Sequence, residues 1–215
     1  MDKTVKAVIF DMDGVILDTE SICDYAWDIA GKEFGIEDGT NIQKLCLGTN
    51  KNDTRKIITD NLGKDFDVEG YLVRCSEIFN KIEEEKGIGL MPYAKEILDY
   101  LKPQYKIALA SSTRQVTVQR QLTDAGLIDY FENRICGDMV EHSKPNPDIY
   151  LKACQSIGEK PENCVAVEDS PNGIKSAAAA GMRTIMVPDR IAPTEELKPL
   201  CWKICSSLKD LKDFL

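Results

Sequence analysis

The first apolar run of the chain is short and ends abruptly in charged residues. Val5–Phe10 is apolar apart from Lys6 and rich in β-branched residues, which is typical of a buried strand. Asp11, Asp13 and Gly14 follow directly. Because side chains two residues apart on an extended chain point the same way, we expect the two carboxylates to project together from the end of this strand. Gly14 would let the backbone turn sharply beside them.

After this strand the apolar pattern takes a helical period. Apolar residues recur at steps of three and four from Thr19, a candidate N-cap, as far as Gly35. Further helices are predicted around residues 53–62 and over 68–86, and no strand is predicted between 17 and 86. The pattern therefore predicts a small all-helical unit, inserted directly after the first strand.

Beyond residue 88 the helical and strand patterns alternate. The breaker-rich segment 86–92 predicts a linker. The expected helices cover 93–101, 115–125, 148–157 and 173–180, and the expected strands cover 106–110, 134–136, 164–167 and 184–187. Such alternation with short connections predicts an α/β unit, a parallel sheet with helices on both faces. After Trp202 we expect a short extended piece and a final amphipathic turn or two.

Charge and hydropathy exclude several classes of protein. The 215 residues carry a formal net charge of -9, which argues against a nucleic-acid-binding surface. No apolar run approaches the length of a membrane span, so no membrane partner is expected. The N-terminal apolar stretch is short and broken by Asp11 and Asp13, unlike a signal peptide.

Cysteine and histidine usage narrows the chemistry. The eight cysteines lie singly among apolar neighbours, which favours reduced thiols and a cytoplasmic location. Cys201 and Cys205 do not have the spacing of a zinc site. The single histidine, His142, is expected in an exposed loop. Most mechanisms that need a histidine in a defined place are therefore disfavoured, and acid–base chemistry is expected from carboxylates.

Polar residues gather where the predicted strands end. The first strand ends in Asp11 and Asp13, the second in residues 111–113 (Ser-Ser-Thr), and a third in residues 168–170 (Glu-Asp-Ser). The carboxyl ends of parallel strands share one edge of a sheet. Lys144 lies in a proline-bracketed loop on the way to that edge. The sequence thus predicts that carboxylates, hydroxyls and a lysine converge in one crevice.

This combination suits phosphoryl transfer onto a carboxylate. Clustered carboxylates repel one another unless a cation intervenes, and a ligand set of oxygens alone suits Mg²⁺. Hydroxyl residues just before a helix present backbone N–H groups to an anion, and Lys144 adds a positive charge. A carboxylate within such a site can act as a nucleophile towards phosphorus.

Four stretches of the chain resemble, in order, the four motifs of the haloacid dehalogenase-like hydrolase superfamily. They are Asp11–Val15, Ser111, Lys144–Asp148 and Glu168–Gly173. The resemblance covers nearly the whole chain, and the helical insertion resembles the cap of the subfamily that contains β-phosphoglucomutase and sugar-phosphate phosphatases. It implies a Rossmann-like catalytic core at residues 1–16 and 88–215, and a helical cap domain at 17–87. It also implies Mg²⁺ as cofactor and a small phosphorylated metabolite as partner.

The resemblance also implies roles for individual residues. Asp11 would be the nucleophile, and Asp13 the acid that protonates the leaving oxygen and then the base that activates water. An acid at the position of Asp13 is absent from true dehalogenases of this superfamily, so dehalogenation is not expected. Mg²⁺ would be held by the Asp11 carboxylate, the Asp13 carbonyl and Asp169, with Glu168 beside them. The phosphoryl oxygens would be held by Ser111, the Ser112 N–H and Lys144.

Two positions in the cap depart from the mutase pattern. Cys23 stands where β-phosphoglucomutase has a histidine that controls the acid–base aspartate, and a thiol cannot replace an imidazole there; a small apolar filler is the plainer interpretation. Lys51 stands where the mutase has an arginine for the second phosphate, and lysine lacks its bidentate fork. Both differences favour hydrolysis. Glu20 and Lys51 are expected to be solvated charges of the cap, with contact to the substrate as the alternative.

The leading hypothesis is a Mg²⁺-dependent phosphomonoester hydrolase with an aspartyl-phosphate intermediate, acting on small phosphorylated metabolites such as sugar phosphates. A phosphosugar mutase and a non-catalytic phosphate-binding protein of the same fold are the alternatives. The sequence leaves the substrate and the oligomeric state open, and a monomer is compatible with it.

Overall fold

The computed structural model describes residues 5–46 and 51–215. The chain divides into two compact units, Met1–Asp18 with Gly89–Leu215 and Thr19–Ile88. The boundaries that the sequence predicts, after residues 16 and 87, lie next to these. Each unit is described by itself below.

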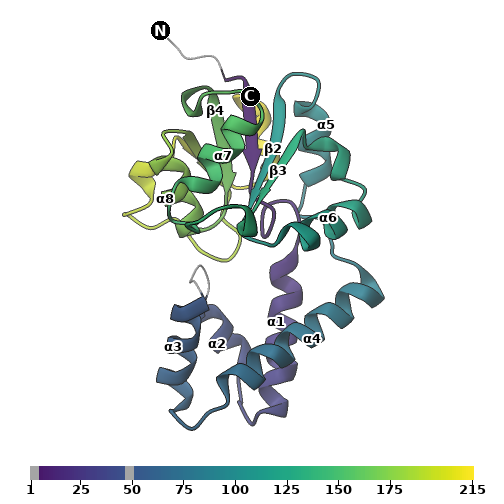
Figure 1. The fold of residues 1–215 in the computed structure, drawn as a ribbon, viewed down its shortest axis with the longest axis vertical. Coiled ribbons are helices and arrows are strands. Elements are labelled where there is room, and N and C mark those ends of the chain that lie inside the picture. Colours follow the sequence, from purple (N-terminus) through teal and green to yellow (C-terminus); the bar gives the residue numbers. More distant parts are fainter. Residues whose placement is uncertain (1–4, 47–50) are drawn as a thin grey trace. The chain divides into compact units, whose positions relative to one another are not determined.

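The first unit contains a six-stranded parallel sheet with the order β3-β2-β1-β4-β5-β6 (Figure 1). Its strands are β1 (Ala7–Phe10), β2 (Lys106–Ser111), β3 (Asn133–Cys136), β4 (Cys164–Glu168), β5 (Arg183–Met186) and β6 (Lys203–Ile204). The predicted parallel α/β sheet is therefore confirmed. The first strand lies inside the sheet between β2 and β4, so the residues that follow these three strands lie at one edge.

Helices cover the sheet because its strands are apolar on both faces. Ala7 and Ile9 of β1 belong to a core cluster with α7 (Asp148–Ser156) and α8 (Pro171–Ala179), and the other two residues of the strand are equally buried. Near-continuous apolar strands of this kind are typical of parallel sheets. The other helices of this unit are α5 (Ala94–Leu101), α6 (Gln115–Asp124) and the 3-10 helices Ile128–Tyr130, Gly137–Met139, Pro161–Asn163, Lys198–Leu200 and Leu208–Asp213.

The chain leaves and re-enters this unit through adjacent segments. Leu17 forms an antiparallel bridge with Leu90, and the Asp18 N–H donates to the Gly89 carbonyl at 2.9 Å. The extended piece that the sequence predicts after Trp202 corresponds to β6, which pairs with β5, and the final turns correspond to the 3-10 helix Leu208–Asp213.

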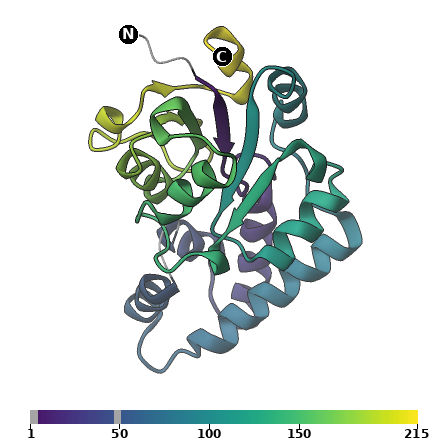
Figure 2. The ribbon, with the colours of Figure 1, turned by 45° about the horizontal axis from the view of Figure 1, so that its top comes forward.

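The second unit is helical in the residues that the structure describes. It contains α1 (Thr19–Glu33), α2 (Gly39–Cys46), α3 (Lys51–Leu62) and α4 (Val68–Lys86), with the long α4 packed along α1 (Figure 2). Its core gathers small and β-branched residues around Tyr71, which is fully buried. The sequence missed the short α2.

The predicted N-cap at Thr19 is wrong. Thr19 is the first residue of α1, and its buried hydroxyl has no hydrogen-bond partner among the described residues.

Across the described ranges 5–46 and 51–215, every helix falls short of the length and apolar character needed to cross a bilayer.

Candidate active site

The aspartates that follow β1 lie at the centre of the sheet edge. The Asp11 N–H continues the ladder by donating to the Val167 carbonyl at 3.0 Å. The turn at Gly14 has a φ of 74°, which confirms that this position needs glycine's conformational freedom. It also allows a close approach, since a Cβ atom on Gly14 would lie 2.6 Å from Asp169 Oδ2. The residues after β1 and β4 are therefore in direct contact.

Lys144 reaches the same point from the loop before α7. Its Nζ donates to Asp11 Oδ1 at 2.6 Å, to Glu168 Oε1 at 2.7 Å and to the Ala110 carbonyl at 2.9 Å. Only 7% of the lysine side chain is exposed. The structure thus brings together the ends of β1, β2 and β4 through one ammonium group, as the sequence predicts.

Glu168 is held on both of its carboxylate oxygens. Oε1 accepts from Lys144 and from the Tyr150 hydroxyl at 2.8 Å. Oε2 accepts from the N–H groups of Asp169 and Ser170, at 3.2 Å each, and from the Ser170 hydroxyl at 3.0 Å. The helix that follows packs so closely that a Cβ on Gly173 would lie 1.8 Å from Oε1. Five donors and a glycine backbone therefore fix this carboxylate.

Asp13 is held by hydroxyl groups at the end of β2. Thr113 Oγ1 donates to Asp13 Oδ2 at 2.8 Å, and Ser111 Oγ donates to the same oxygen at 3.3 Å. The Thr113 N–H in turn donates to Ser111 Oγ at 3.0 Å. Ser112 is exposed at the same strand end. Ser111, Ser112 and Asp13 are thus adjacent, whereas the phosphate-binding roles predicted for the two serines stay predictions.

Burial dominates the electrostatics of this group. Burial raises the pKa of Asp11 to about 8, although the adjacent Lys144 charge opposes the shift. Burial lowers the pKa of Lys144, but the charges of Asp11 and Glu168 outweigh it and keep the ammonium protonated. Tyr150 stays a hydrogen-bond donor because burial, followed by the Glu168 charge, raises its pKa. The carboxylates outnumber the single ammonium, so this cluster favours additional positive charge.

The carboxylates fit a hard divalent cation. Among the described residues, Asp11, Glu168 and Asp169 each offer an oxygen within 4.8 Å of the other two. A set of oxygen donors alone, with excess negative charge, suits Mg²⁺ rather than a softer metal. Glu168 already accepts hydrogen bonds at both oxygens, which favours Asp11 and Asp169 as direct ligands.

The predicted cap residues lie in the helical unit. Glu20 Oε2 accepts from Gln43 Nε2 at 3.0 Å. Cys23 lies in the wall of a cavity of about 630 Å³ that this unit forms by itself. Lys51 is the first residue of α3, and its side chain lies outside the described residues. The substrate contacts predicted for all three stay predictions.

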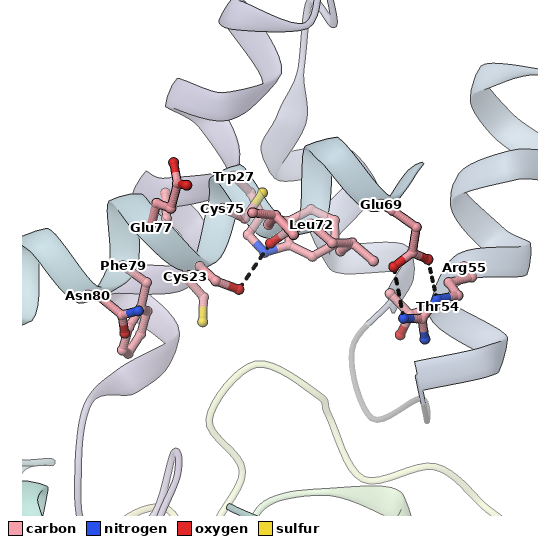
Figure 3. Close-up of a pocket in the computed structure, with 13 residues that line it drawn as sticks. Cys23, Trp27, Thr54, Arg55, Glu69, Leu72, Cys75, Glu77, Phe79 and Asn80 are labelled. Atoms are coloured by element: carbon pink, nitrogen blue, oxygen red, sulfur yellow. Dashed lines mark hydrogen bonds and ion pairs between the residues drawn. The ribbon is translucent and has the colours of Figure 1, made fainter. Parts of the chain in front are cut away.

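The cavity has an apolar floor and polar ends. Cys23 lies at one end with Asn80, and Arg55 lies at the other end with Glu69 (Figure 3). Between them lie the apolar side chains of Trp27 and Leu72, and Phe79 lies beside Asn80. The Arg55 guanidinium donates to both oxygens of Glu69, one of them at 3.1 Å. The main cation of the wall is therefore already paired with a carboxylate.

The fold and the aspartate-centred site define a class that sequence comparison supports. The model of the haloacid dehalogenase-like hydrolase family matches residues 5–181. The chain belongs to this family of hydrolases.

The names of several similar proteins refer to enzymes that act on phosphorylated carbohydrates. The chain is 31% identical over 186 residues to a phosphorylated carbohydrates phosphatase from Thermotoga maritima, covering 84% of each chain. It is 29% identical over 231 residues to hexitol phosphatase B of Escherichia coli, covering 99% of this chain and 98% of that one. A solved structure from Thermotoga maritima, provisionally assigned as a β-phosphoglucomutase, superposes with a TM-score of 0.80 and 28% identity over 98% of this chain and 100% of that chain.

The sequence pattern does not identify the roles of three polar residues of the site. It places Thr113 only within a hydroxyl cluster, although Thr113 makes the shorter bond to Asp13. It places Ser170 within a motif but does not predict the hydrogen bond from its hydroxyl to Glu168. Tyr150 lies two residues beyond the Lys144–Asp148 motif, and a tyrosine on the buried face of a helix needs a partner for its hydroxyl. This need for a partner is the feature of the sequence that points to Tyr150 as a residue of the site.

Proposed function

We propose that this hydrolase is a Mg²⁺-dependent phosphomonoester phosphatase that acts on small phosphorylated metabolites, with sugar phosphates as the substrate class. The observation that carries the proposal is the placement of Asp11. Its carboxylate lies at the tip of the central strand, bonded to a buried ammonium at 2.6 Å. A carboxylate beside a fixed cation and other oxygen ligands is suited to attack on phosphorus.

The proposed reaction has two steps. In the first, an Asp11 oxygen forms a bond to phosphorus as the bond to the leaving oxygen breaks, and Asp13 gives its proton to that oxygen. In the second, Asp13 takes a proton from water as the water oxygen attacks phosphorus, which releases phosphate and restores Asp11. The Thr113 hydroxyl, which donates to Asp13 Oδ2 at 2.8 Å, supports this role because it can fix the orientation of the carboxylate while the Ser111 hydroxyl turns to the phosphoryl group.

Other residues would bind the phosphoryl group and the cation. Lys144, the Ser111 hydroxyl and the Ser112 N–H would hold the phosphoryl oxygens. Mg²⁺ would be held by the carboxylates of Asp11 and Asp169 and by the Asp13 carbonyl, with Glu168 beside them. When bound, the cation would neutralise charge on the carboxylates and on the phosphoryl oxygens.

The cavity of the helical unit supports hydrolysis over a mutase reaction. A mutase must also bind a second phosphate, which needs an available cation. Among the wall residues that the structure describes, which do not include the side chain of Lys51, Arg55 is paired with Glu69 and Glu77 is paired with Arg74. The cavity therefore fits an uncharged organic group with both apolar and polar parts, such as a sugar or polyol.

The Asp11→Asn variant tests the proposal. We expect it to lose Mg²⁺-dependent phosphate release from a panel of phosphorylated metabolites by at least about a thousandfold, because an amide cannot form the covalent intermediate. Asp60→Asn is the matched control, since Asp60 is an exposed aspartate of α3 paired with Lys56. Retained activity in Asp11→Asn would show that Asp11 is not the nucleophile.

Product analysis separates the alternative functions. Free phosphate equal to the substrate consumed supports a phosphatase. Interconversion of sugar 1- and 6-phosphates that depends on a bisphosphate activator, with little free phosphate, would instead identify a mutase. If the wild-type chain turns over none of the panel but binds phosphate, the non-catalytic alternative replaces the proposal.

A further inference from the structure

A buried tyrosine shares a carboxylate oxygen with the lysine of the site. Tyr150 is fully buried, and its hydroxyl donates to Glu168 Oε1 at 2.8 Å. Lys144 Nζ donates to the same oxygen at 2.7 Å. The tyrosine hydroxyl and the ammonium that donates to Asp11 therefore share one acceptor atom.

The aromatic ring lies beneath the same ammonium. Lys144 Nζ is 5.1 Å from the centre of the Tyr150 ring, within the range of a cation–π interaction. The ring belongs to the core cluster between α7 and the sheet, so it cannot swing away without disturbing that core. Tyr150 thus combines a rigid position with a hydroxyl aimed at the site.

A lysine needs such support to be held in one place. Its ammonium is a point charge on a flexible stem with rotatable donors, and the geometry of its acceptors alone defines where it lies. Two of its three acceptors belong to carboxylates, and the terminal torsion of a glutamate side chain is intrinsically broad. Three donors from Asp169 and Ser170 hold Glu168 Oε2. Apart from Lys144 itself, Tyr150 is the donor that holds Oε1.

We infer that Tyr150 is a positioning residue that holds Glu168 Oε1 and thereby keeps the Lys144 ammonium in place to bind a phosphoryl oxygen. The inference rests on the proposed function, because it takes Lys144 as a ligand of the phosphoryl group. It predicts that the hydroxyl of Tyr150 contributes to phosphate affinity although it never contacts phosphate.

The Tyr150→Phe variant removes this hydroxyl and keeps the ring. The binding of inorganic phosphate, measured by calorimetry in the presence of Mg²⁺, is expected to weaken about fivefold, which corresponds to the net value of one hydrogen bond. This readout needs no turnover. The unfolding midpoint in urea is measured in parallel, since a lost hydroxyl bond in the core also lowers stability.

Tyr71→Phe is the matched control. Tyr71 is also fully buried, and its hydroxyl donates to the Trp27 carbonyl at 3.1 Å in the helical unit. We expect a similar loss of stability with unchanged phosphate affinity. Equal phosphate affinity in wild type and Tyr150→Phe would overturn the inference, as would an equal loss in both variants. If the wild-type chain binds no phosphate, the proposed function itself fails.

Discussion

Each unit of the molecule contains a cation that bridges two carboxylates, but the two clusters differ in burial. In the α/β unit, Lys144 joins Asp11 and Glu168, and 7%, 10% and 0% of these side chains are exposed. In the helical unit, Arg74 joins Glu33 and Glu77, with 40%, 42% and 59% exposed. The bond lengths are similar, at 2.6 and 2.7 Å for lysine and 2.6 to 3.0 Å for arginine.

The difference in burial reverses the direction in which the pKa of the carboxylate shifts. Hydrogen bonding with Arg74 lowers the pKa of Glu33, as expected for a carboxylate that meets a cation in water. Burial raises the pKa of Asp11 to about 8 even though its cation is as close. An exposed cluster of this kind joins two helices at the surface, whereas in the buried one the ionised form of Asp11 is disfavoured until a further cation compensates its charge.

Removing the buried cation is expected to have the largest effect. Lys144→Met leaves Asp11 and Glu168 buried without an ammonium, which should cost about 3–5 kcal/mol of stability at pH 7 and abolish phosphate release. Arg74→Met is the matched change in the exposed cluster, and we expect a far smaller change in stability with activity retained.

Urea unfolding of both variants at low and high ionic strength tests this contrast. The small loss in Arg74→Met should shrink further as salt screens the surface charges, and the loss in Lys144→Met should not. Equal losses in the two variants would mean that burial does not separate the clusters.

Two glycines extend the comparison to packing against a carboxylate. A Cβ on Gly173 would lie 1.8 Å from Glu168 Oε1, and a Cβ on Gly70 would lie 2.1 Å from Asp67 Oδ2. Glu168 cannot move because five donors hold it, so Gly173→Ala should cost about 3 kcal/mol. Asp67 is exposed and can rotate away. Gly70→Ala would then lose an N-cap bond of about 1 kcal/mol and regain a similar amount from alanine's helix propensity.

Thermal unfolding distinguishes these outcomes, with Gly70→Ala close to wild type and Gly173→Ala well below it. A Gly173→Ala protein as stable as wild type would show that Glu168 can reorient, and would also weaken the argument that Tyr150 must hold it.

These close approaches mark the limit of what the sequence predicts. The parallel sheet follows from apolar runs such as that of β1, and the meeting of Asp11 with Lys144 follows from strand ends that share an edge. The need for glycine at position 173 depends on the path of α8 over the Glu168 side chain, which no local pattern contains. Likewise, the sequence does not predict α2, because this helix begins at a glycine and has apolar side chains only at Ile42, Leu45 and Cys46, whereas the equally short α5 is richer in apolar residues.

The smallest expected effect on activity comes from the contact between His142 and Asp148, which lies in the loop that carries Lys144. The Nδ1 of His142 lies 3.0 Å from Asp148 Oδ2, so the pair spans this loop. The hydrogen bond with Asp148, and then the charges of Asp148 and Glu141, raise the pKa of His142 above 6.5. The same hydrogen bond lowers the pKa of Asp148 below 3.8.

The sign of the pH dependence follows from these two shifts. The histidine contributes stability that is full below pH 6.5 and is lost as the pH rises through its folded pKa. The aspartate contributes stability that is present above pH 3.8 and is lost as the pH falls through its own folded pKa. The pair therefore stabilises the loop most between pH 3.8 and pH 6.5.

The pKa of His142 can be measured directly. Since His142 is the single histidine of the chain, its imidazole resonances in a proton NMR titration report this pKa without assignment. We expect Asp148→Asn to lower the pKa of His142 towards its ordinary value and to leave phosphate release nearly unchanged at pH 8, because the His142 side of this contact is exposed to solvent. An unchanged pKa in Asp148→Asn would show that the pair does not form in solution, and a large loss of activity at pH 8 would show that Asp148 supports Lys144 by more than this exposed contact.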